Sequence, residues 1–452
     1  MLRSLMSGVS GARGHQTFLD VVGNNIANIN TVGFKKSNVT FQDLLYQTHR
    51  GAMPPVEGRG GVNSLQVGLG VRVAAIETIH TQGNINYVGG DTNVAIQGEG
   101  YYVVTDGNNR LFTRGGNFTL DSENKIVQSG TGYRVQGYQM VADPNDPTKF
   151  NRSSSLSDIS IPIGSKMEAR TTTKVGFRCN LDSKAPVVDP ATWDPAAWDP
   201  YADPPMETPP TASSHKSQIE IFDSLGKGHT LEVLWVRTGQ QEDNEWSWVA
   251  YLPDAGSPQF VQRGVLTFGP DGKPAAGADV SPGITIDFTS VGAESSDITL
   301  DFAGESFDKP PIEGVTQYAS PFTTKGYYQD GCAMGVMESF MVTNNGTVMA
   351  TYDNGQNVPM YRMSLATFVN PSGLTKVGDT VFKESSNSGL ARIGVPMEDG
   401  AGALIGGALE MSNIDLTEEF TQLILAQRGF QANARVINTS DQVLEEQINI
   451  KR

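Results

Sequence analysis

The sequence predicts a mainly β protein that carries one α-helix at each end and is built from nested domains. Two patterns support this prediction. Apolar residues recur every three or four positions within 2–26 and again within 416–448, which is the spacing of an amphipathic helix. From about Val71 the apolar period changes to two, with Gly-rich turns between short segments, as in β-strands. The long middle is therefore expected to be β structure enclosed by two terminal helices.

Each expected helix has an apolar stripe that it cannot bury alone. The stripe at the start of the chain consists of Leu2, Leu5, Val9, Ala12, Leu19 and Ile26. The stripe at its end consists of Phe420, Leu423, Phe430, Ala434, Ile437, Leu444 and Ile448. The economical partner for either helix is the other terminus, or copies of both from neighbouring subunits. We therefore expect an assembly protein and not a catalyst, with these stripes as its assembly interface.

Local sequence patterns predict where each helix begins and ends. The first helix is expected from about Ser4 to Asn28, because an Asn-rich stretch that tolerates left-handed backbone follows. The second is expected to begin near Asp415, with Asp415 or Ser412 as its N-cap. Two glutamates follow in the first turn of that helix, where negative charge is favourable.

The composition bounds the size and the partners of the molecule. At 452 residues the chain is too long for one hydrophobic core, so about two to four domains are expected. The formal net charge is −16, which argues against nucleic acid as a partner, because phosphate binding needs a basic face. Solubility is the simplest explanation of the acidity.

The sequence lacks the signatures of several functional classes. No run of about 18 apolar residues occurs, so no membrane span is expected, and the first residues lack the apolar region of a signal peptide. The five histidines show no metal-ligand spacing, and no phosphate-binding loop or nucleophile elbow is present. We therefore expect no cofactor, no metal and no enzymatic turnover. The chain is expected either to stay in the cytoplasm or to be exported without a cleavable signal.

The expected elements nest within one another. The expected domains are a helical inner core (1–35 with 412–452), an extended connecting segment (36–75), a β domain nearest the core (76–168 with 322–411) and an outer inserted β domain (169–321). Within the outer domain, residues 186–210 are rich in proline and repeat Trp-Asp-Pro at Trp193 and Trp198, which predicts an extended surface loop. Packing of these tryptophans on their own domain is favoured over docking on a neighbour.

Both ends of the chain resemble those of the flagellar axial proteins. At the N-terminus the similarity lies in Asn24-Asn25-Ile26-Ala27-Asn28 and in Asn30-Thr31-Val32-Gly33-Phe34-Lys35. At the C-terminus it lies in residues 415–420 and 426–435. Rod and hook proteins share these ends, but Ile221-Phe222-Asp223-Ser224-Leu225-Gly226 in the middle is similar to the hook insert domain. The resemblance therefore covers nearly the whole chain and is closest to the hook proteins.

This resemblance implies a structural subunit of a flexible helical tube that carries motor torque to the flagellar filament. The implied partners are further copies of the chain, the flagellar rod, the hook cap, the hook–filament junction proteins and the flagellar type III export apparatus. The implied location is the flagellar hook, which is periplasmic in a spirochete and otherwise extracellular. A distal rod protein is the main alternative, although a rod protein is expected to be shorter. A fibrous adhesin is disfavoured because no signal peptide is visible.

The segment 171–181 is similar to the spirochete branch of the hook proteins. The resemblance implies a lysinoalanine cross-link, in which a cysteine joins a lysine of an adjacent subunit, and the matching pair is Cys179 and Lys166. Loss of the Cys179 sulfur by β-elimination leaves dehydroalanine, to which a neutral lysine amine adds. Arg178 and Asn180 flank the cysteine and are expected to assist, by favouring thiolate and by orienting groups through hydrogen bonds.

Purely structural roles are the competing interpretation of these residues. A lone cysteine in a strand is most often a small buried hydrophobe, and a lysine in a turn is usually a solvated charge. Lys174 is a rival candidate for the lysine of the cross-link. Cys332 lies beside an expected turn and is interpreted as structural. Without the cross-link, the chain is still expected to be a hook subunit or another axial subunit.

Overall fold

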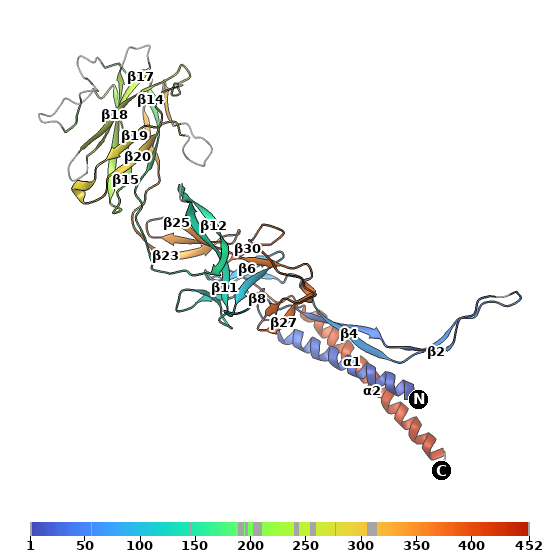
Figure 1. Ribbon diagram of the computed structural model, residues 1–452. Helices are drawn as coiled ribbons and strands as arrows, with labels where there is room; N and C mark the ends of the chain where they lie inside the picture. Colours follow the sequence, from blue (N-terminus) through green and yellow to red (C-terminus); the bar gives the residue numbers. More distant parts are fainter. Residues whose placement is uncertain are drawn as a thin grey trace. The chain divides into compact units, whose positions relative to one another are not determined.

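The computed structural model divides the chain into two compact units (Figure 1). Unit 1 comprises Met1–Pro162, Phe340–Ala350 and Val358–Arg452, and unit 2 comprises Ile163–Ser339 and Thr351–Asn357. The fold is mainly β with one long helix near each end, which confirms the predicted fold class. The residues that the structure describes are 2–55, 57–143, 146–188, 194, 198–201, 210–238, 244–253, 259–275, 277–304 and 314–450.

Unit 1 contains both long helices and most of the short strands. Its helices are α1 (Leu2–Ala27) and α2 (Leu416–Ile450). Its first strands are β1 (Ser37–Asp43), β2 (Tyr46–Arg50), β3 (Leu65–Gly68), β4 (Val71–Thr78), β5 (Ile85–Tyr87), β6 (Val94–Gln97), β7 (Tyr101–Thr105), β8 (Arg110–Thr113), β9 (Phe118–Leu120), β10 (Ile126–Gln128), β11 (Arg134–Asp143) and β12 (Asp146–Asp158). Its last elements are β26 (Leu365–Thr367), the 3₁₀ turn η2 (Pro371–Gly373), β27 (Thr375–Gly378), β28 (Val381–Lys383), β29 (Arg392–Gly394), β30 (Ala403–Gly406) and β31 (Ala408–Glu410). Three strands contain residues of both units: β23 (Gly335–Val342), β24 (Thr347–Tyr352) and β25 (Asn357–Met363).

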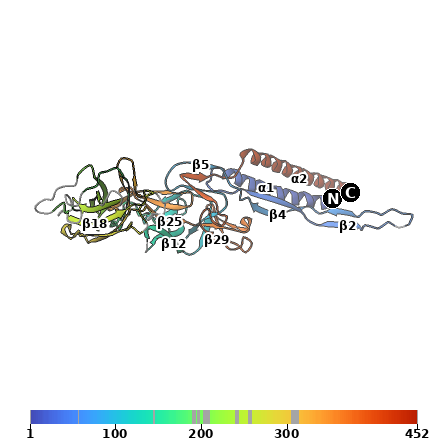
Figure 2. The same ribbon diagram turned by 90° about the horizontal axis from the view of Figure 1, so that it is seen from above.

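The two terminal helices pack along each other (Figures 1 and 2). The N-cap expected at Asp415 is present, because its Oδ1 accepts hydrogen bonds from the backbone N–H groups of Thr417 at 2.8 Å and Glu418 at 3.3 Å. α1 ends at Ala27, within the Asn-rich stretch, and the chain then turns through Gly33, whose φ is 69°. Each terminal helix therefore has the other as its partner within one chain.

The segment after α1, which was expected to be an extended connection, forms two antiparallel strand pairs. β1 pairs with β4, from Ser37 opposite Thr78 to Asp43 opposite Val71, and this pair lies along α1. β2 pairs with β3 and continues away from the helices as a two-stranded ribbon (Figure 2). Every residue of β2 and β3 is exposed. Because these side chains are exposed, they are available for contacts with other surfaces. Such contacts would stabilise the ribbon, since a two-stranded ribbon is only marginally stable alone.

The β domain of unit 1 is organised around β11. This strand pairs antiparallel with β7, β12 and β25, and β7 continues through β8 to β28. Two further antiparallel pairs join β5 to β31 and β6 to β30. These pairs bring the chain that precedes α2 back beside the chain that follows α1. One buried cluster of the domain contains Tyr101, Val103, Phe112, Ala366, Leu374 and Phe382.

Three charged side chains that are far apart in the sequence meet in the interior of unit 1. Lys35 Nζ lies 2.7 Å from Glu410 Oε1, and Arg114 Nε lies 2.9 Å from Glu410 Oε2. Glu410 also accepts a hydrogen bond from Gly83 N at 2.9 Å, and Lys35 donates one to Thr81 O at 2.7 Å. Burial lowers the pKa of Lys35, and the Glu410 carboxylate opposes that shift. This network joins the loop after α1 to the last strand before α2.

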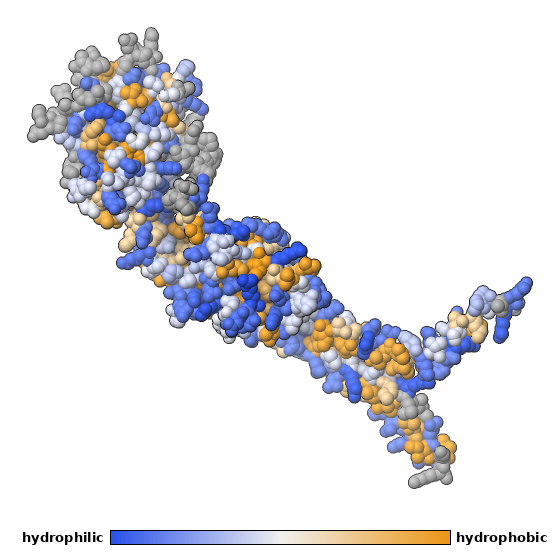
Figure 3. Space-filling view, in the orientation of Figure 1, coloured by the Kyte–Doolittle hydropathy of each residue, from blue (hydrophilic) through white to orange (hydrophobic). Residues whose placement is uncertain are grey.

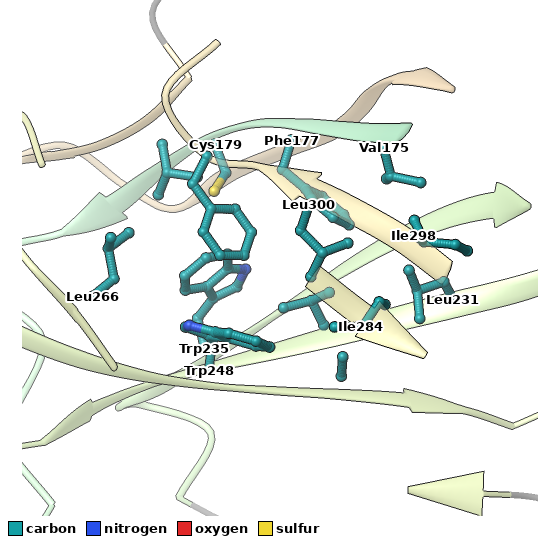
Figure 4. Close-up of a cluster of buried hydrophobic side chains, with 14 of the residues drawn as sticks. Val175, Phe177, Cys179, Leu231, Trp235, Trp248, Leu266, Ile284, Ile298 and Leu300 are labelled. Carbon is teal, nitrogen blue, oxygen red and sulfur yellow. The ribbon is translucent and has the colours of Figure 1, made fainter. Parts of the chain in front are cut away.

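Unit 2 is a sandwich of two sheets. Its elements are β13 (Lys166–Met167), β14 (Lys174–Asp182), β15 (Ser214–Phe222), β16 (Gly228–Thr238), β17 (Glu245–Leu252), β18 (Gln259–Thr267), β19 (Gly283–Ile286), the 3₁₀ turn η1 (Thr289–Val291), β20 (Ser296–Asp301), β21 (Val315–Tyr318) and β22 (Thr323–Gln329). One sheet has the order β15-β16-β17-β18. The other has the order β19-β20-β14-β21, and β22 also pairs with β14. The side chains between the sheets include Phe177, Trp235, Trp248 and Leu300 (Figure 4).

Most of the Pro-rich loop 186–210, including Trp193, lies outside the described residues. Trp198 is described and is 5% exposed. It packs on the outer face of the β15–β18 sheet, where its ring centroid lies 6.1 Å from that of Tyr251. This tryptophan therefore packs on its own domain, as the sequence analysis favoured.

Replacing Glu410 with Gln is expected to destabilise unit 1 by about 3–5 kcal/mol, because two buried cations lose their counter-ion. Urea unfolding followed by far-UV circular dichroism at helical wavelengths reports unit 1, which contains both long helices. Tryptophan fluorescence reports unit 2, because all five tryptophans lie there, and it is expected not to change. The control is Glu418→Gln, which breaks a half-exposed pair with Lys36 and costs less than about 1 kcal/mol. Equal losses in both variants would contradict the structural role of the buried network.

Candidate functional site

Glycine residues allow α1 and α2 to approach closely. A Cβ atom added at Gly11 would lie 2.9 Å from Asn433 Nδ2 and still closer to the amide oxygen of the same side chain. A Cβ atom added at Gly429 would collide with the ring of His15. Each helix therefore places a polar side chain into a space that a glycine leaves on the other. The sequence pattern did not reveal this role of the glycines, because it depends on how two distant helices cross.

The predicted apolar stripes lie on this helix pair but are only partly covered by it. The half-buried members are Leu5, Val9, Ala12, Leu19, Ile26, Leu423, Ala434, Ile437 and Leu444. Phe420, Phe430 and Ile448 are 48%, 38% and 67% exposed, and the side chain of Leu2 is not described. The most buried apolar positions of the pair are Val22 at 1% and Ala426 at 0%. The assignment of the stripes to an assembly interface stays a prediction.

α2 also carries large apolar side chains outside the predicted stripe. Ile424, Leu425 and Val436 are 55%, 62% and 42% exposed. Figure 3 shows apolar surface over the helical end of unit 1. Large contiguous apolar patches on a soluble monomer usually mark a surface that binds another molecule.

A buried polar contact fixes the far end of the helix pair. Asn25 Nδ2 donates to Glu419 Oε2 at 3.1 Å and to Ser37 O at 2.9 Å, and Asn25 Oδ1 accepts from Ser37 N at 3.0 Å. Glu419 is 1% exposed, although the sequence suggested only that it suits the first turn of a helix. Asn25 belongs to the Asn-rich stretch that was predicted to end α1. No local pattern indicates its pairing with Glu419, because the two residues lie at opposite ends of the chain.

β14 places Cys179 inside the sandwich core of unit 2. The thiol is 3% exposed, and Figure 4 shows the Cys179 side chain directed into the apolar cluster that contains Trp235. Burial raises the pKa of the Cys179 thiol to about 12, and a hydrogen bond with Ser217 opposes this shift. In the single chain the thiol is therefore protonated at neutral pH and shielded from solvent. Cys332 is also a buried free cysteine.

The residues that flank Cys179 belong to the other face of β14, because side chains alternate along a strand. Arg178 and Asn180 line a groove of about 560 Å³. Asn180 Nδ2 donates to Ser320 O at 3.0 Å, and its Oδ1 accepts from Tyr318 N at 2.9 Å. In the single chain Asn180 thus holds the turn between β21 and β22. Assistance of a cross-link by Arg178 or Asn180 stays a prediction.

Both candidate lysines are exposed. Lys166 lies in β13, opposite Val336 of β23. Lys174 begins β14, where its backbone N–H donates to Asp330 Oδ1 at 2.9 Å. Lys174 is an odd number of residues before Cys179 in the same strand, so the two side chains point to opposite faces. A bond between Cys179 and Lys166 stays a prediction for the assembled state.

Two other kinds of site are absent from the part of the chain that the structure describes. There, no three His, Cys, Asp or Glu side chains gather closely enough to hold a metal ion. No helix in the same residues has the length and apolar character needed to cross a membrane.

Four protein-family models match successive parts of the chain. They are the models described as flagella basal body rod protein (residues 5–35), flagellar hook protein FlgE/F/G D1 domain (95–175), flagellar basal body protein FlaE D2 domain (180–332) and flagellar basal body rod FlgEFG protein C-terminal (405–450). The first model covers most of α1, and the last covers all of α2. The two middle models fall on the β regions.

Similar proteins match over the full length. The chain is 39% identical to the flagellar hook protein FlgE of Borreliella burgdorferi and 37% identical to that of Treponema pallidum, with 100% of both chains covered in each case. Among solved structures, the Helicobacter pylori flagellar hook protein FlgE2 matches with a TM-score of 0.52 at 15% identity. That match covers 73% of this chain and 100% of the other, and it supports the fold alone.

Replacing Gly429 with Ala is expected to destabilise the helix pair by about 1–3 kcal/mol, because the added methyl group overpacks against His15. The loss is expected despite the better helix propensity of alanine. Gly23→Ala in α1 is the matched control, since no heavy atom lies within 4 Å of its added Cβ, and it is expected to stabilise by about 0.5–1 kcal/mol. Thermal unfolding followed by far-UV circular dichroism measures both variants. Equal stabilisation by the two would show that the helices do not approach this closely.

Proposed function

The chain belongs to the flagellar hook protein family and is a structural subunit of the hook, and we propose that its copies polymerise through the terminal helices into a flexible tube that transmits torque. The observation that carries this proposal is the apolar surface left open on α2, where Phe420, Ile424 and Leu425 are each about half exposed or more. A second copy that covers these side chains removes apolar surface from water, which favours association. The sequence relatives named above are hook proteins, not enzymes.

The two units are suited to different tasks in such a tube. The open apolar surface of α1 and α2 belongs to unit 1, which is proposed to form the inner layer. Unit 2 has a closed core, in which Trp235, Trp246 and Trp248 are at most 2% exposed. A domain with a complete core acts as a rigid body, and polar, hydrated contacts between such bodies allow them to slide as the tube bends.

The remaining partners belong to the same proposal and are supported only by the resemblance to the family. The tube is proposed to join rod proteins at one end and junction proteins at the other, with a cap during growth. The chain is proposed to leave the cell through the flagellar type III export apparatus. The similarity to spirochete hook proteins favours a periplasmic hook over an extracellular one.

A distal rod protein is the second candidate, because the models that match the two ends of the chain are those of rod proteins. Rod and hook tubes differ in curvature. Electron micrographs of the assembled chain distinguish them, since a hook forms curved, bendable tubes and a rod forms straight ones.

Replacing Phe430 with Asp is expected to abolish tube formation while the single chain stays folded. The side chain is 38% exposed in the single chain, so the charge costs little there, whereas burial between copies leaves it unpaired. Sedimentation and electron microscopy measure polymerisation, and circular dichroism measures folding. Phe430→Leu keeps the surface apolar and is expected to polymerise normally. Normal tubes from Phe430→Asp would exclude this face of α2 from the assembly interface.

We further propose that Cys179 and Lys166 of adjacent subunits form a lysinoalanine cross-link after assembly. Two features support a reaction that occurs only after assembly. The thiol is buried and its pKa is raised to about 12, which opposes reaction in the single chain. Lys166 is exposed, so it is available to a neighbour. Contacts in the polymer have to open the strand around Cys179 before the reaction starts.

The proposed reaction needs no oxidant or reductant. A base removes the Cα proton of Cys179, the electron pair forms a double bond between Cα and Cβ, and the Cβ–Sγ bond breaks. The sulfur leaves as hydrosulfide and takes up a proton to become hydrogen sulfide. The neutral Nζ of Lys166 then adds to Cβ and gives up one proton, while Cα regains one. The sum is one new C–N bond and the loss of one hydrogen sulfide.

Replacing Cys179 with Ala is expected to leave tube formation intact but to make the tubes dissociate into single chains when boiled in detergent. Lys166→Arg keeps the charge and is expected to behave in the same way, because a guanidinium does not add to dehydroalanine under these conditions. Lys174→Arg is the matched control and is expected to retain detergent-stable ladders. Electrophoresis and peptide mass spectrometry of the tubes measure the outcome. Stable ladders from Cys179→Ala would exclude Cys179 as the link.

A further inference from the structure

A groove runs beside α1 on the side of β4. Its volume is about 410 Å³, and its lining combines apolar and cationic side chains, among them Met6, Val9, Leu44, Leu69, Arg13 and Arg72. Arg72 donates to the neutral side chain of Gln42 at 3.1 Å. Among the described residues, neither arginine has a carboxylate within 4.0 Å of its guanidinium nitrogens. The groove therefore suits an apolar ligand that also carries negative charge.

The C-terminal end of α2 carries both apolar and negatively charged side chains, and these side chains are exposed. The last contact that ties α2 to α1 by a hydrogen bond joins Ser440 to Ser4, with 3.4 Å between the hydroxyl oxygens. From Glu445 to Ile450 every residue is exposed, and Ile450 reaches 85%. Glu445 and Glu446 lie in the last turns of the helix, where the helix dipole disfavours negative charge. These carboxylates therefore do not stabilise their own helix.

We propose that residues 443–450 of one copy dock in the α1–β4 groove of a second copy. Val443 and Ile450 lie seven residues apart and share one face of the helix, with Glu446 at its border. The apolar face meets the apolar lining of the groove, and the glutamates meet Arg13 and Arg72. The inference rests on the proposed polymerisation and names two surfaces that carry it.

The groove cannot take the same segment from its own chain. α2 packs on the face of α1 that carries Gly11, whereas Val9 and Arg13, each two positions from Gly11 and so on the far side of the helix, line the groove beside β4. α2 is one continuous helix, so its end can reach the groove only by breaking. Two different surfaces then meet head to tail, which is the type of contact from which open helical polymers are built.

Charge reversal in the full chain tests this contact. The first variant reverses the end of α2 (Glu445→Lys with Glu446→Lys), the second reverses the groove (Arg13→Glu with Arg72→Glu), and the third combines all four changes. Each one-sided variant is expected to raise the critical concentration for polymerisation about tenfold, since two ion pairs become two repulsions. The fourfold variant is expected to return to within about twofold of wild type. Glu338→Lys, an exposed charge reversal in unit 2, is the control and is expected to have no effect.

Mixing the two one-sided variants tests whether the contact joins different copies. Reversed helix ends meet reversed grooves in the mixture, and native ends meet native grooves, so polymerisation is expected to recover. Arg13→Gln with Arg72→Gln removes charge with less perturbation and is expected to weaken both polymerisation and its salt dependence. One-sided variants that polymerise like wild type would overturn the inference and leave the proposed function standing, and so would failure of the mixture when the fourfold variant recovers. A wild-type chain that forms no tubes would overturn both.

Discussion

The close pairing of α1 with α2 is the constraint on which the rest of the molecule depends. The first and last helices of the chain lie side by side because glycines remove the side chains that would separate them, and Asn25 and Glu419 fix one end of the pair. Because both ends of the chain lie in the helix pair, the segment between them has to leave this pair and return to it. The β regions therefore nest, with the strands before α2 pairing with strands that follow α1. Unit 2 is inserted in the middle of that loop.

The buried network of Lys35, Arg114 and Glu410 carries this constraint from the helices into the β domain. It joins the loop after α1, the end of a strand in the β domain and the last strand before α2. Separating these three segments would leave a buried charge unpaired or expose it to solvent. Such a junction ties the helices to the strands of unit 1. In the proposed tube, compliance is then expected outside this junction.

Periodicity and local caps made much of this fold predictable, because they depend on neighbouring residues. The three-four spacing predicted both helices, and Asp415 caps the second as expected. The period of two in Val175, Phe177, Cys179 and Leu181 is consistent with an inward-facing cysteine, and the structure places it in the core. The contacts between Lys35 and Glu410 and between Asn25 and Glu419 were not predictable, because their partners lie hundreds of residues apart. The role of Gly429 depends on the crossing of two helices, which one sequence pattern does not specify.

Hydrogen–deuterium exchange of the full chain before and after polymerisation tests the central claim most directly. The terminal helices are proposed to carry assembly, and unit 2 is already folded in the single chain. A large gain of protection is therefore predicted in residues 416–450 and in the ribbon of β2 and β3. Little change is predicted in β16 and β17, whose amides already lie in a complete sheet. Protection gained mainly in β16 and β17, with α2 unchanged, would contradict the account.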